Sequence, residues 1–543
     1  MPSGTKGASL QTRDECDLFG AIPNPGLRTR NIYTIGLALD WILSLIFIIG
    51  GSLMTNAKNV KVPHQLEGIG IIINFYAHTY PEEPFPKSHR IYHLIPGGNL
   101  LVTTLLNFLV TIVLDSTNYN HAVTLRWVLF REGRLRFDSN IRLFTRSKCH
   151  GPNSWYFNII SGVGLAISHG ALSCMMMEVN VEGAVNKQKQ VFEKIQSPPR
   201  GFVEVNLLAV SALGIGLLLQ VVVSTYSLLC SHGVLTWSSN LLANAKAIAG
   251  VQDSRSKVGS KFTPQRSQDS MLSIAPEIRL IRYLIWGFCG LSTTWSLGQG
   301  VYVSVCGYMT DDKIAWFRKP MQYWKFYGAM WAPFGKISEP SSYWLGLLVQ
   351  IVLQSFLTLA LHCLELLFNI PRDEATWRNM ETVGSKPSPS IMSNLSRQGL
   401  FLSIIKATLH WIFGYAFSAD LTFNIALMLI IALMVVFIPL AVLTEYMIKK
   451  RPKGSIPGCY GNFQRVWGWV DEWNHQKLFW GDKGELVLGF RRAGTSGKRL
   501  PELHSNILYY CSQASELERE GSLQQLKLGS VSDRDSTSDK NVE

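Results

Sequence analysis

Long blocks of apolar residues alternate with polar connections along the chain. A helix rises 1.5 Å per residue, so about 20 apolar residues cross the ~30 Å hydrocarbon layer of a membrane. Seven blocks meet this length, and an eighth is weaker because it contains Lys406 and His410. The pattern predicts an all-α bundle of membrane-spanning helices. The strong blocks are 32–54, 98–118, 155–177, 203–230, 283–307, 343–369 and 420–447, and the weaker one is 399–418.

The predicted transmembrane bundle, 32–447, follows a polar N-terminal arm at 1–31. After the bundle, 448–512 contains aromatic segments that we expect to pack against the membrane face as a cytoplasmic tail. The last segment, 513–543, is polar, and we expect it to be disordered. Inside the bundle, the connection at 251–270 is rich in Ser, Gln and Lys and has few apolar residues, which predicts a mobile loop.

The distribution of charge predicts how the helices are oriented. Hydrophobic residues make up 47% of the chain and charged residues only 16%, as in membrane proteins, and the net charge of +13 is concentrated beside block ends. This placement favours anionic lipid headgroups as partners and argues against nucleic acid. One set of alternate connections, the N-terminal arm, 119–154, 231–279 and 370–398, holds 4, 7, 6 and 4 Lys or Arg residues. The other set, 55–97, 178–202 and 308–342, holds 4, 4 and 5.

The positive-inside rule places the richer set of connections in the cytoplasm. The basic cluster from Lys449 to Lys453, directly after the last block, belongs on the same side. Both termini are then cytoplasmic, which requires an even number of spans. This favours counting the weak block and predicts about eight spans in an integral, multi-pass membrane protein, without indicating which membrane.

Five ionisable residues lie inside the predicted spans. Inserting a charged side chain at the centre of a membrane helix costs ~2.5–3.5 kcal/mol of free energy. They lie four to eight residues from the predicted cytoplasmic ends, or ~6–12 Å deep. Two interpretations remain open. The side chains could line one inward-facing polar vestibule, or they could snorkel towards the headgroups and pair with neighbours. The five residues are Asp40, Asp115, His362, Glu365 and Lys406.

Other residues in the blocks predict contacts between helices. Glu365 and Lys406 lie at similar depth on consecutive blocks, so we expect them to form an ion pair. His169 and Gln220 lie well inside their blocks, where a polar side chain usually bonds to a neighbouring helix. Close helix packing is also expected at two pairs of glycines, 162 with 164 and 214 with 216.

Four long strings, in the same order along the chain, resemble a group of multi-pass membrane proteins of filamentous fungi that has no assigned function. The resemblance implies a fungal source and a membrane bundle, and it implies no activity. The strings are TLRWVLFREGRLRFDSNIRLFT (124–145), LTWSSN (235–240), LHCLELLFNIPRDEATWR (361–378) and GCYGNFQRVWGWVDEWNHQKLFWGDKGELVLGFRRAGTS (458–496).

All four strings fall in connections or helix ends that the charge pattern places in the cytoplasm. Arginines of the first string would face carboxylates of the last two, so one hypothesis is a cytoplasmic cap of docked loops held by Arg–carboxylate pairs. The alternative is that each charge is solvated separately or binds lipid phosphate. The residues are Arg126, Arg131, Arg134, Arg136, Arg142, Asp373, Glu374, Asp471 and Glu472.

Motifs for catalysis and cofactors are lacking in the sequence. There is no GxSxG, P-loop or HExxH pattern, the nine cysteines form no CxxC, and no His pair is spaced to hold haem across two spans. We therefore expect no metal and no cofactor, and an enzyme is the least favoured class. A transporter or channel with a cytoplasm-facing vestibule is slightly favoured, and a membrane scaffold or sensor acting through docked cytoplasmic loops is the alternative. The sequence names no protein partner.

Overall fold

The structure is a computed structural model that describes most, but not all, of the chain. The predicted disorder at 513–543, most of the N-terminal arm and Arg142 lie outside the described residues. The described ranges are 26–56, 89–93, 98–140, 143–178, 202–230, 233–251, 260–264, 269–275, 278–305, 339–389, 397–419, 423–425, 427–487 and 490–511.

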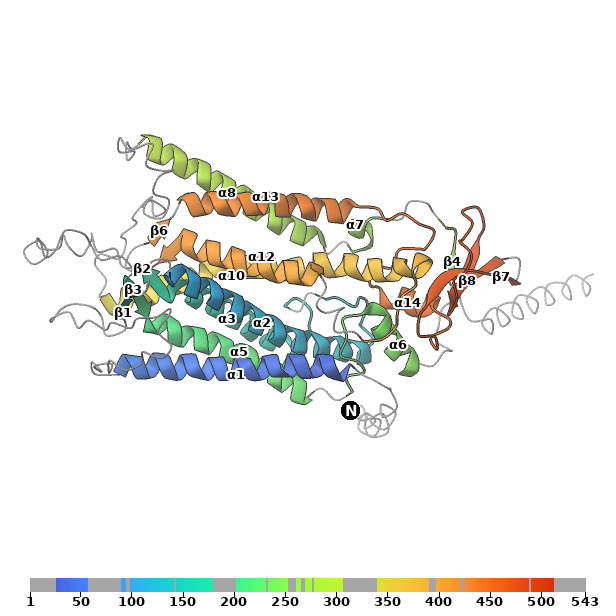
Figure 1. The fold of residues 1–543 in the computed structure, drawn as a ribbon, viewed down its shortest axis with the longest axis horizontal. Coiled ribbons are helices and arrows are strands. Elements are labelled where there is room, and N and C mark those ends of the chain that lie inside the picture. Colours follow the sequence, from blue (N-terminus) through green and yellow to red (C-terminus); the bar gives the residue numbers. More distant parts are fainter. Residues whose placement is uncertain are drawn as a thin grey trace, which may run out of the picture.

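Eight long helices form the body of the described molecule and lie side by side with alternating direction (Figure 1). Seven of them are long and apolar enough to span a membrane, including α12, which corresponds to the weak block. The exception is α8, whose polar run at 292–300 lowers its mean hydropathy. The helices are α1 (Leu27–Asn56), α2 (Gly98–Arg131), α3 (Trp155–Cys174), α5 (Leu207–Cys230), α8 (Ile278–Val305), α10 (Glu339–Thr382), α12 (Arg397–Ala416) and α13 (Leu427–Lys449).

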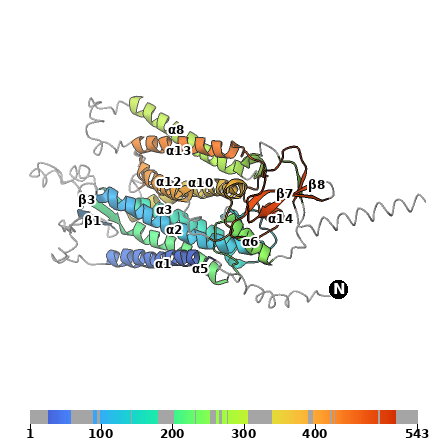
Figure 2. The same cartoon turned by 45° about the vertical axis from the view of Figure 1, so that its right-hand side comes forward.

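The outer faces of these helices are apolar, as expected for a surface in contact with lipid. On α1, for example, Ile35, Ile42 and Ile46 are each more than half exposed. The interior has two apolar cores: one is formed by α2, α3 and α5, with α1 packed against it, and the other by α8, α10, α12 and α13. Figures 1 and 2 show the same two groups of helices, with α1 and α8 on opposite sides. The two halves meet where α10 packs on α3 and α12 packs on α2.

Glycines allow α3 and α5 to approach closely. The sequence predicted close helix packing at four glycines, and the structure shows it at three of them. A Cβ atom at Gly216 would lie 2.7 Å from the backbone nitrogen of Ser168, and one at Gly164 would lie 3.0 Å from the carbonyl oxygen of Gly216. Gly214 meets the backbone of α1 at 2.8 Å in the same way. Gly162 is different, because its nearest neighbour would be a Leu143 methyl group at 3.8 Å.

We expect Gly216→Val to separate α3 from α5 and to destabilise the bundle by about 1–3 kcal/mol, the usual effect of overpacking a close contact. The melting temperature of the purified protein in detergent measures this. Gly162→Val is the matched control, because it makes the same change on α3 where there is space. Equal melting temperatures for both variants would contradict a backbone contact at Gly216.

The all-α prediction is wrong for the connections, which contain three small sheets. One joins β1 (His89–His93), β3 (Phe202–Asn206) and β2 (Met176–Glu178), and a second joins β5 (Phe417–Ala419) and β6 (Phe423–Ile425). Several of these strands are the ends of apolar blocks that we expected to be helical. A short apolar run fits a strand as well as a helix, so periodicity could not separate them.

The third sheet has four strands in the order β4-β9-β8-β7 and lies at the opposite end of the bundle from the other two (Figure 1). Strands β8 and β9 are parallel, and the other neighbours are antiparallel. The strands are β4 (Ser260–Phe262), β7 (Phe479–Val487), β8 (Phe490–Ser496) and β9 (Tyr509–Cys511), and the short helices beside them are α6 (Leu241–Val251), α7 (Met271–Ile274) and α14 (Phe463–Trp469).

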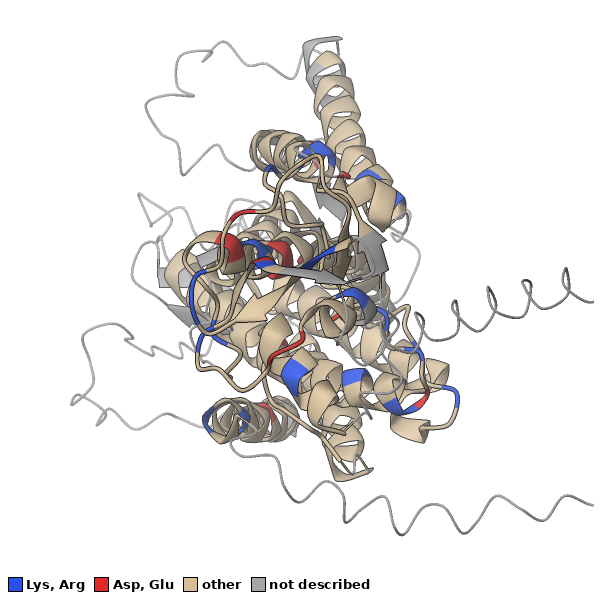
Figure 3. Ribbon diagram, turned by 90° about the vertical axis from the view of Figure 1, so that its right-hand side faces the viewer, with Lys and Arg blue, Asp and Glu red and all other residues tan. Residues whose placement is uncertain are grey.

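We call the third sheet, α6, α14 and the adjoining ends of α2 and α10 the cap. Its core is rich in tryptophan: the ring of Trp377, from the end of α10, lies 5.6 Å from Trp469 and 5.3 Å from Trp480. Because α10 extends into this core, it has 44 residues and is ~66 Å long, more than a membrane crossing requires. Figure 3 looks onto this end of the molecule and shows Lys and Arg spread across it.

The mobile-loop prediction for 251–270 is wrong at Ser260–Phe262. This segment is β4 and pairs with Tyr509–Cys511. Its order therefore comes from a partner strand about 250 residues further along the chain, which local composition does not reveal.

Candidate functional site

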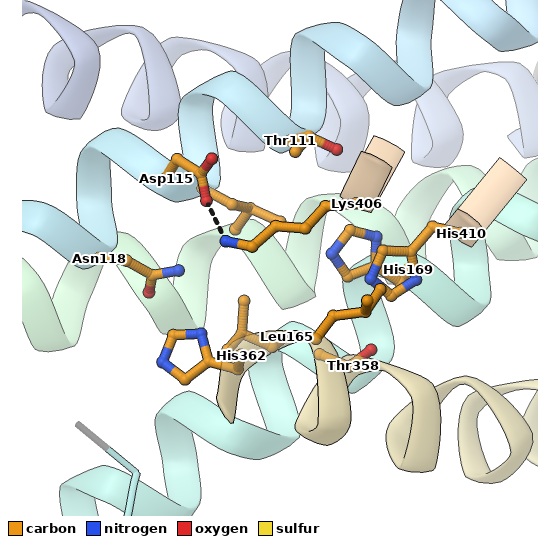
Figure 4. A pocket seen from close by; sticks show the side chains of 11 residues that line it. Thr111, Asp115, Asn118, Leu165, His169, Thr358, His362, Lys406 and His410 are labelled. Atoms are coloured by element: carbon orange, nitrogen blue, oxygen red, sulfur yellow. Dashed lines mark hydrogen bonds and ion pairs between the residues drawn. The ribbon is translucent and has the colours of Figure 1, made fainter. Parts of the chain in front are cut away.

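A buried ionic cluster lies where the two halves of the bundle meet. Lys406 on α12 is 7% exposed, and its Nζ donates to Asp115 Oδ1 on α2 at 3.0 Å. It also forms an ion pair with Glu365 on α10, so the predicted Glu365–Lys406 pair is confirmed. Ser403 Oγ donates to the other oxygen of Asp115 at 2.7 Å. Three helices are thus joined through one ammonium group. Figure 4 shows its bond to Asp115.

The cluster brings several ionisable groups together. Lys406 carries one positive charge and faces two carboxylates, Asp115 and Glu365. His362, one helical turn before Glu365, places its Nδ1 3.7 Å from Glu365 Oε1. The two carboxylates and the imidazole are three groups of the kind that can accept or release a proton.

A second polar group extends the cluster through α3, α10 and α12. The rings of His169 and His410 are stacked with centroids 3.6 Å apart and planes 3° from parallel. His410 Nδ1 lies 3.0 Å from Gln354 Oε1, and Gln354 Nε2 donates to Ser173 Oγ at 2.8 Å. The predicted contact of His169 with a neighbouring helix is thus a ring stack on His410 of α12.

Sequence reasoning missed the roles of His410 and Gln354, although their spacing carried a signal. His410 is four residues after Lys406, and Gln354 is eleven residues before Glu365. Both separations return to the same face of a helix. The signal was therefore the spacing of polar residues around a buried charge.

A small cavity lies among these side chains. The space open to the centre of a water molecule is about 20 Å³, which is room for about one water. Polar groups from four helices converge on it (Figure 4). Its lining is Thr111, Leu114, Asp115, Asn118, Leu165, His169, Thr358, Leu361, His362, Lys406 and His410.

The predicted vestibule differs from the structure in membership and in depth. The structure brings together Asp115, His362, Glu365 and Lys406, whereas Asp40 lies apart and accepts a hydrogen bond from Thr117 Oγ1 at 2.7 Å. Asp115 and Thr117 are two residues apart on α2 and so point to different faces. In depth, Lys406 is nine residues after the start of α12 and ten before its end, or ~14 Å from either. The cluster thus lies at mid-height of this helix.

The cap contains a second set of buried polar contacts, which dock the connecting loops on one another. Asp138 N donates to Gly461 O at 2.9 Å, and Phe463 N donates to Arg136 O at 3.0 Å. Glu374 on α10 is 4% exposed and accepts hydrogen bonds from the amides of Cys459 and Tyr460 at 2.9 and 2.7 Å. The loops therefore dock through backbone hydrogen bonds and through side chains, such as Glu374, that bind the backbone of another loop.

Within the described part of the chain, Arg126 and Arg134 form close ion pairs other than those predicted for the cap. The first string supplies its own carboxylates, because Arg126 pairs with Asp138 at 3.2 Å and Arg134 pairs with Glu132 at 2.9 Å. The side chains of Arg131 and Arg136 are exposed. The carboxylates also have local partners: Asp373 pairs with Arg372, Glu374 with Arg378, Asp471 with Lys483 and Arg492, and Glu472 with Lys483 and His475.

Asp471 is the most extensively bonded of these carboxylates. Burial alone would raise its pKa, but Lys483 and the backbone amide of Thr495 outweigh burial and hold the pKa below its ordinary value. Burial would also raise the pKa of Glu472, but Lys483 and His475 together hold this pKa below its ordinary value. Both carboxylates are therefore charged at neutral pH and tie the loop after α14 to the sheet.

Comparisons with protein-family models, with curated proteins and with solved structures gave no match. The structure shows a mostly helical, multi-pass membrane protein with seven helices that are apolar enough to cross. Among the described residues, no three His, Cys, Asp or Glu side chains are arranged to hold a metal ion.

Proposed function

We propose that the protein is a proton-coupled membrane transporter in which the Lys406 cluster takes up and releases the coupling proton. The observation that carries this proposal is the group of one ammonium, two carboxylates and His362 beside a water-sized cavity between the two halves of the bundle. Ionisable groups are expensive inside a membrane and usually mark ion or substrate paths. Two carboxylates and His362 offer sites for one proton.

The position of the cluster supports the same proposal. It joins α2 and α3 of one half to α10 and α12 of the other. In many transporters, substrate and ion sites lie near the membrane midplane between two structural units that rock against each other. A proton on Asp115 or Glu365 would weaken the ionic link between the halves, and its release would restore that link.

We also propose that α8 is the eighth span and that the cap and the start of α1 are cytoplasmic. These parts lie at the same end of the molecule (Figure 1), which requires an even number of crossings. The richer set of Lys and Arg connections is at this end. The Arg282–Glu445 pair ties α8 to α13 at 2.7 Å and offsets part of the cost of inserting α8. A fungal source is a further proposal, and it rests on the four strings alone.

The transport proposal is tested with purified protein in liposomes that contain a pH-sensitive dye. With the inside held negative, a panel of amino acids, sugars, organic acids and inorganic ions is added outside. We expect at least one class of solute to accelerate acidification of the lumen. Glu365→Gln leaves one lysine facing one carboxylate, and we expect it to slow this acidification at least tenfold.

Asp40→Asn is the matched control, because it removes a buried carboxylate that bonds to Thr117 and lies apart from the Lys406 cluster. We expect it to leave solute-driven acidification unchanged. The proposal fails if no solute produces acidification above that of empty liposomes, or if Glu365→Gln transports as fast as the unmodified protein.

A scaffold or sensor that acts through the cap is the second candidate. It is favoured by the tryptophan-rich core of the cap, which extends well beyond the membrane helices. Such a function would survive Glu365→Gln and would be lost when the cap is loosened. A transporter would lose its activity in Glu365→Gln and would be less affected when the cap is loosened.

A further inference from the structure

An open groove of about 500 Å³ lies between α8 and α13, away from the Lys406 cluster. The two helices lie side by side in both ribbon views and are closest near the cap (Figures 1 and 2). The walls of the groove are mostly apolar and aromatic. Trp286, Val442 and Tyr446 are 41%, 55% and 60% exposed, so the described part of the chain leaves them largely uncovered. The lining residues are Trp286, Val442, Glu445, Tyr446, Lys449 and Lys450.

The groove has an excess of positive charge at its cap-side end. Its one carboxylate, Glu445, is already paired with Arg282 at 2.7 Å and with Lys449 at 2.6 Å. Lys450 lies over the ring of Tyr446, with Nζ 5.6 Å from the ring centroid. Three cations and one carboxylate leave two positive charges here. Lys449 remains 63% exposed and is therefore accessible to an anion.

The position of these charges along α13 matches the boundary of a membrane. Lys449 is the last residue of a highly apolar helix, and Lys450 follows it. Trp and Tyr side chains typically lie at the level of the headgroups, as Trp286 and Tyr446 would here. Below them, α8 exposes Leu291 and α13 exposes Val435, each about 60%. The groove is thus basic at the headgroup level and apolar at the level of the acyl chains.

We propose that this groove binds one anionic phospholipid molecule from the leaflet on the cap side. Its phosphate would interact with Lys449 and Lys450, and one acyl chain would lie along the gap between α8 and α13. Basic pockets between transmembrane helices are suited to anionic headgroups. The lipid would fill the space between the less apolar α8 and the rest of the bundle. This binding site is independent of proton coupling at Lys406.

The test is native mass spectrometry of the full-length protein in a neutral detergent, with phosphatidylserine and phosphatidylcholine of identical acyl chains as probes. We expect one phosphatidylserine to bind at least ten times more tightly than phosphatidylcholine. Lys449→Ala/Lys450→Ala is expected to reduce binding to the phosphatidylcholine level. Val442→Trp fills the groove without changing charge, and we expect it to weaken binding of both lipids.

Lys498→Ala/Arg499→Ala is the matched control, because it removes two exposed positive charges from the cap away from the groove. We expect it to leave phosphatidylserine binding unchanged. Equal affinity for the two lipids would overturn the proposal, as would an equal loss in both double variants. Glycerophosphoserine, which lacks acyl chains, separates the two sources of phosphate: if it displaces the lipid at equal concentration, the site takes a soluble phosphate instead.

Discussion

Lys406→Met is expected to remove most of the folded protein from the membrane. The change leaves Asp115 and Glu365 facing each other without the ammonium group that joins them. Breaking a buried ion pair by removing one partner typically costs about 3–5 kcal/mol, a large fraction of a total stability of about 5–15 kcal/mol. Size-exclusion chromatography of detergent extracts measures the monodisperse fraction, and its decline on heating gives the melting temperature.

A neutral version of the whole cluster separates assembly from function. In Lys406→Met/Asp115→Asn/Glu365→Gln, the three side chains keep their approximate size, and the three charges that pair with one another are removed together. Replacing a buried ion pair by neutral groups of similar volume is often close to neutral for stability. We therefore expect the triple variant to be as abundant as the unmodified protein and inactive in solute-driven acidification. A stable Lys406→Met variant would show that the bundle does not depend on these pairs.

The Glu365–Lys406 pair was predictable because two opposite charges in neighbouring apolar blocks have few other partners. Depth along a helix can be read from the sequence, and it placed both residues at similar heights. The direction in which a side chain points around the helix axis is harder to derive from the sequence when the packing face of the helix is unknown. Asp40 was therefore grouped with the cluster, although Thr117, its partner on α2, points away from Asp115.

The cap could be located from the sequence, but its internal contacts could not be derived. Its loops dock in part through backbone groups such as Asp138 N and Gly461 O, which every residue possesses and which leave no side-chain signal. The charged residues that suggested docking mostly bind partners near them in the chain. The extension of α10 beyond its apolar block also depends on distant residues, because Trp377 is buried only when helix α14, which ends at Trp469, and the strand carrying Trp480 pack on it.

Glu374→Ala is expected to loosen the cap while leaving the membrane helices in place. Without this carboxylate, the buried amides of Cys459 and Tyr460 lose their acceptor and Arg378 loses its partner. We expect a loss of about 3–5 kcal/mol in the stability of the cap, again because one member of a buried charged group is removed. The exposure of the Cys459 thiol measures this loss.

Cys459 is fully buried, and burial together with the nearby Glu374 raises the pKa of its thiol well above the ordinary value. At neutral pH it is therefore protonated and protected from a maleimide, since the thiolate is the reactive form. Loosening the cap and removing Glu374 both lower this pKa, so peptide mass spectrometry should find at least tenfold faster labelling at Cys459. Arg134→Ala is the matched control: its pair with Glu132 is partly exposed and is worth less than about 1 kcal/mol. If Arg134→Ala accelerated labelling as much as Glu374→Ala, then surface pairs, and not the buried carboxylate, would hold the cap together.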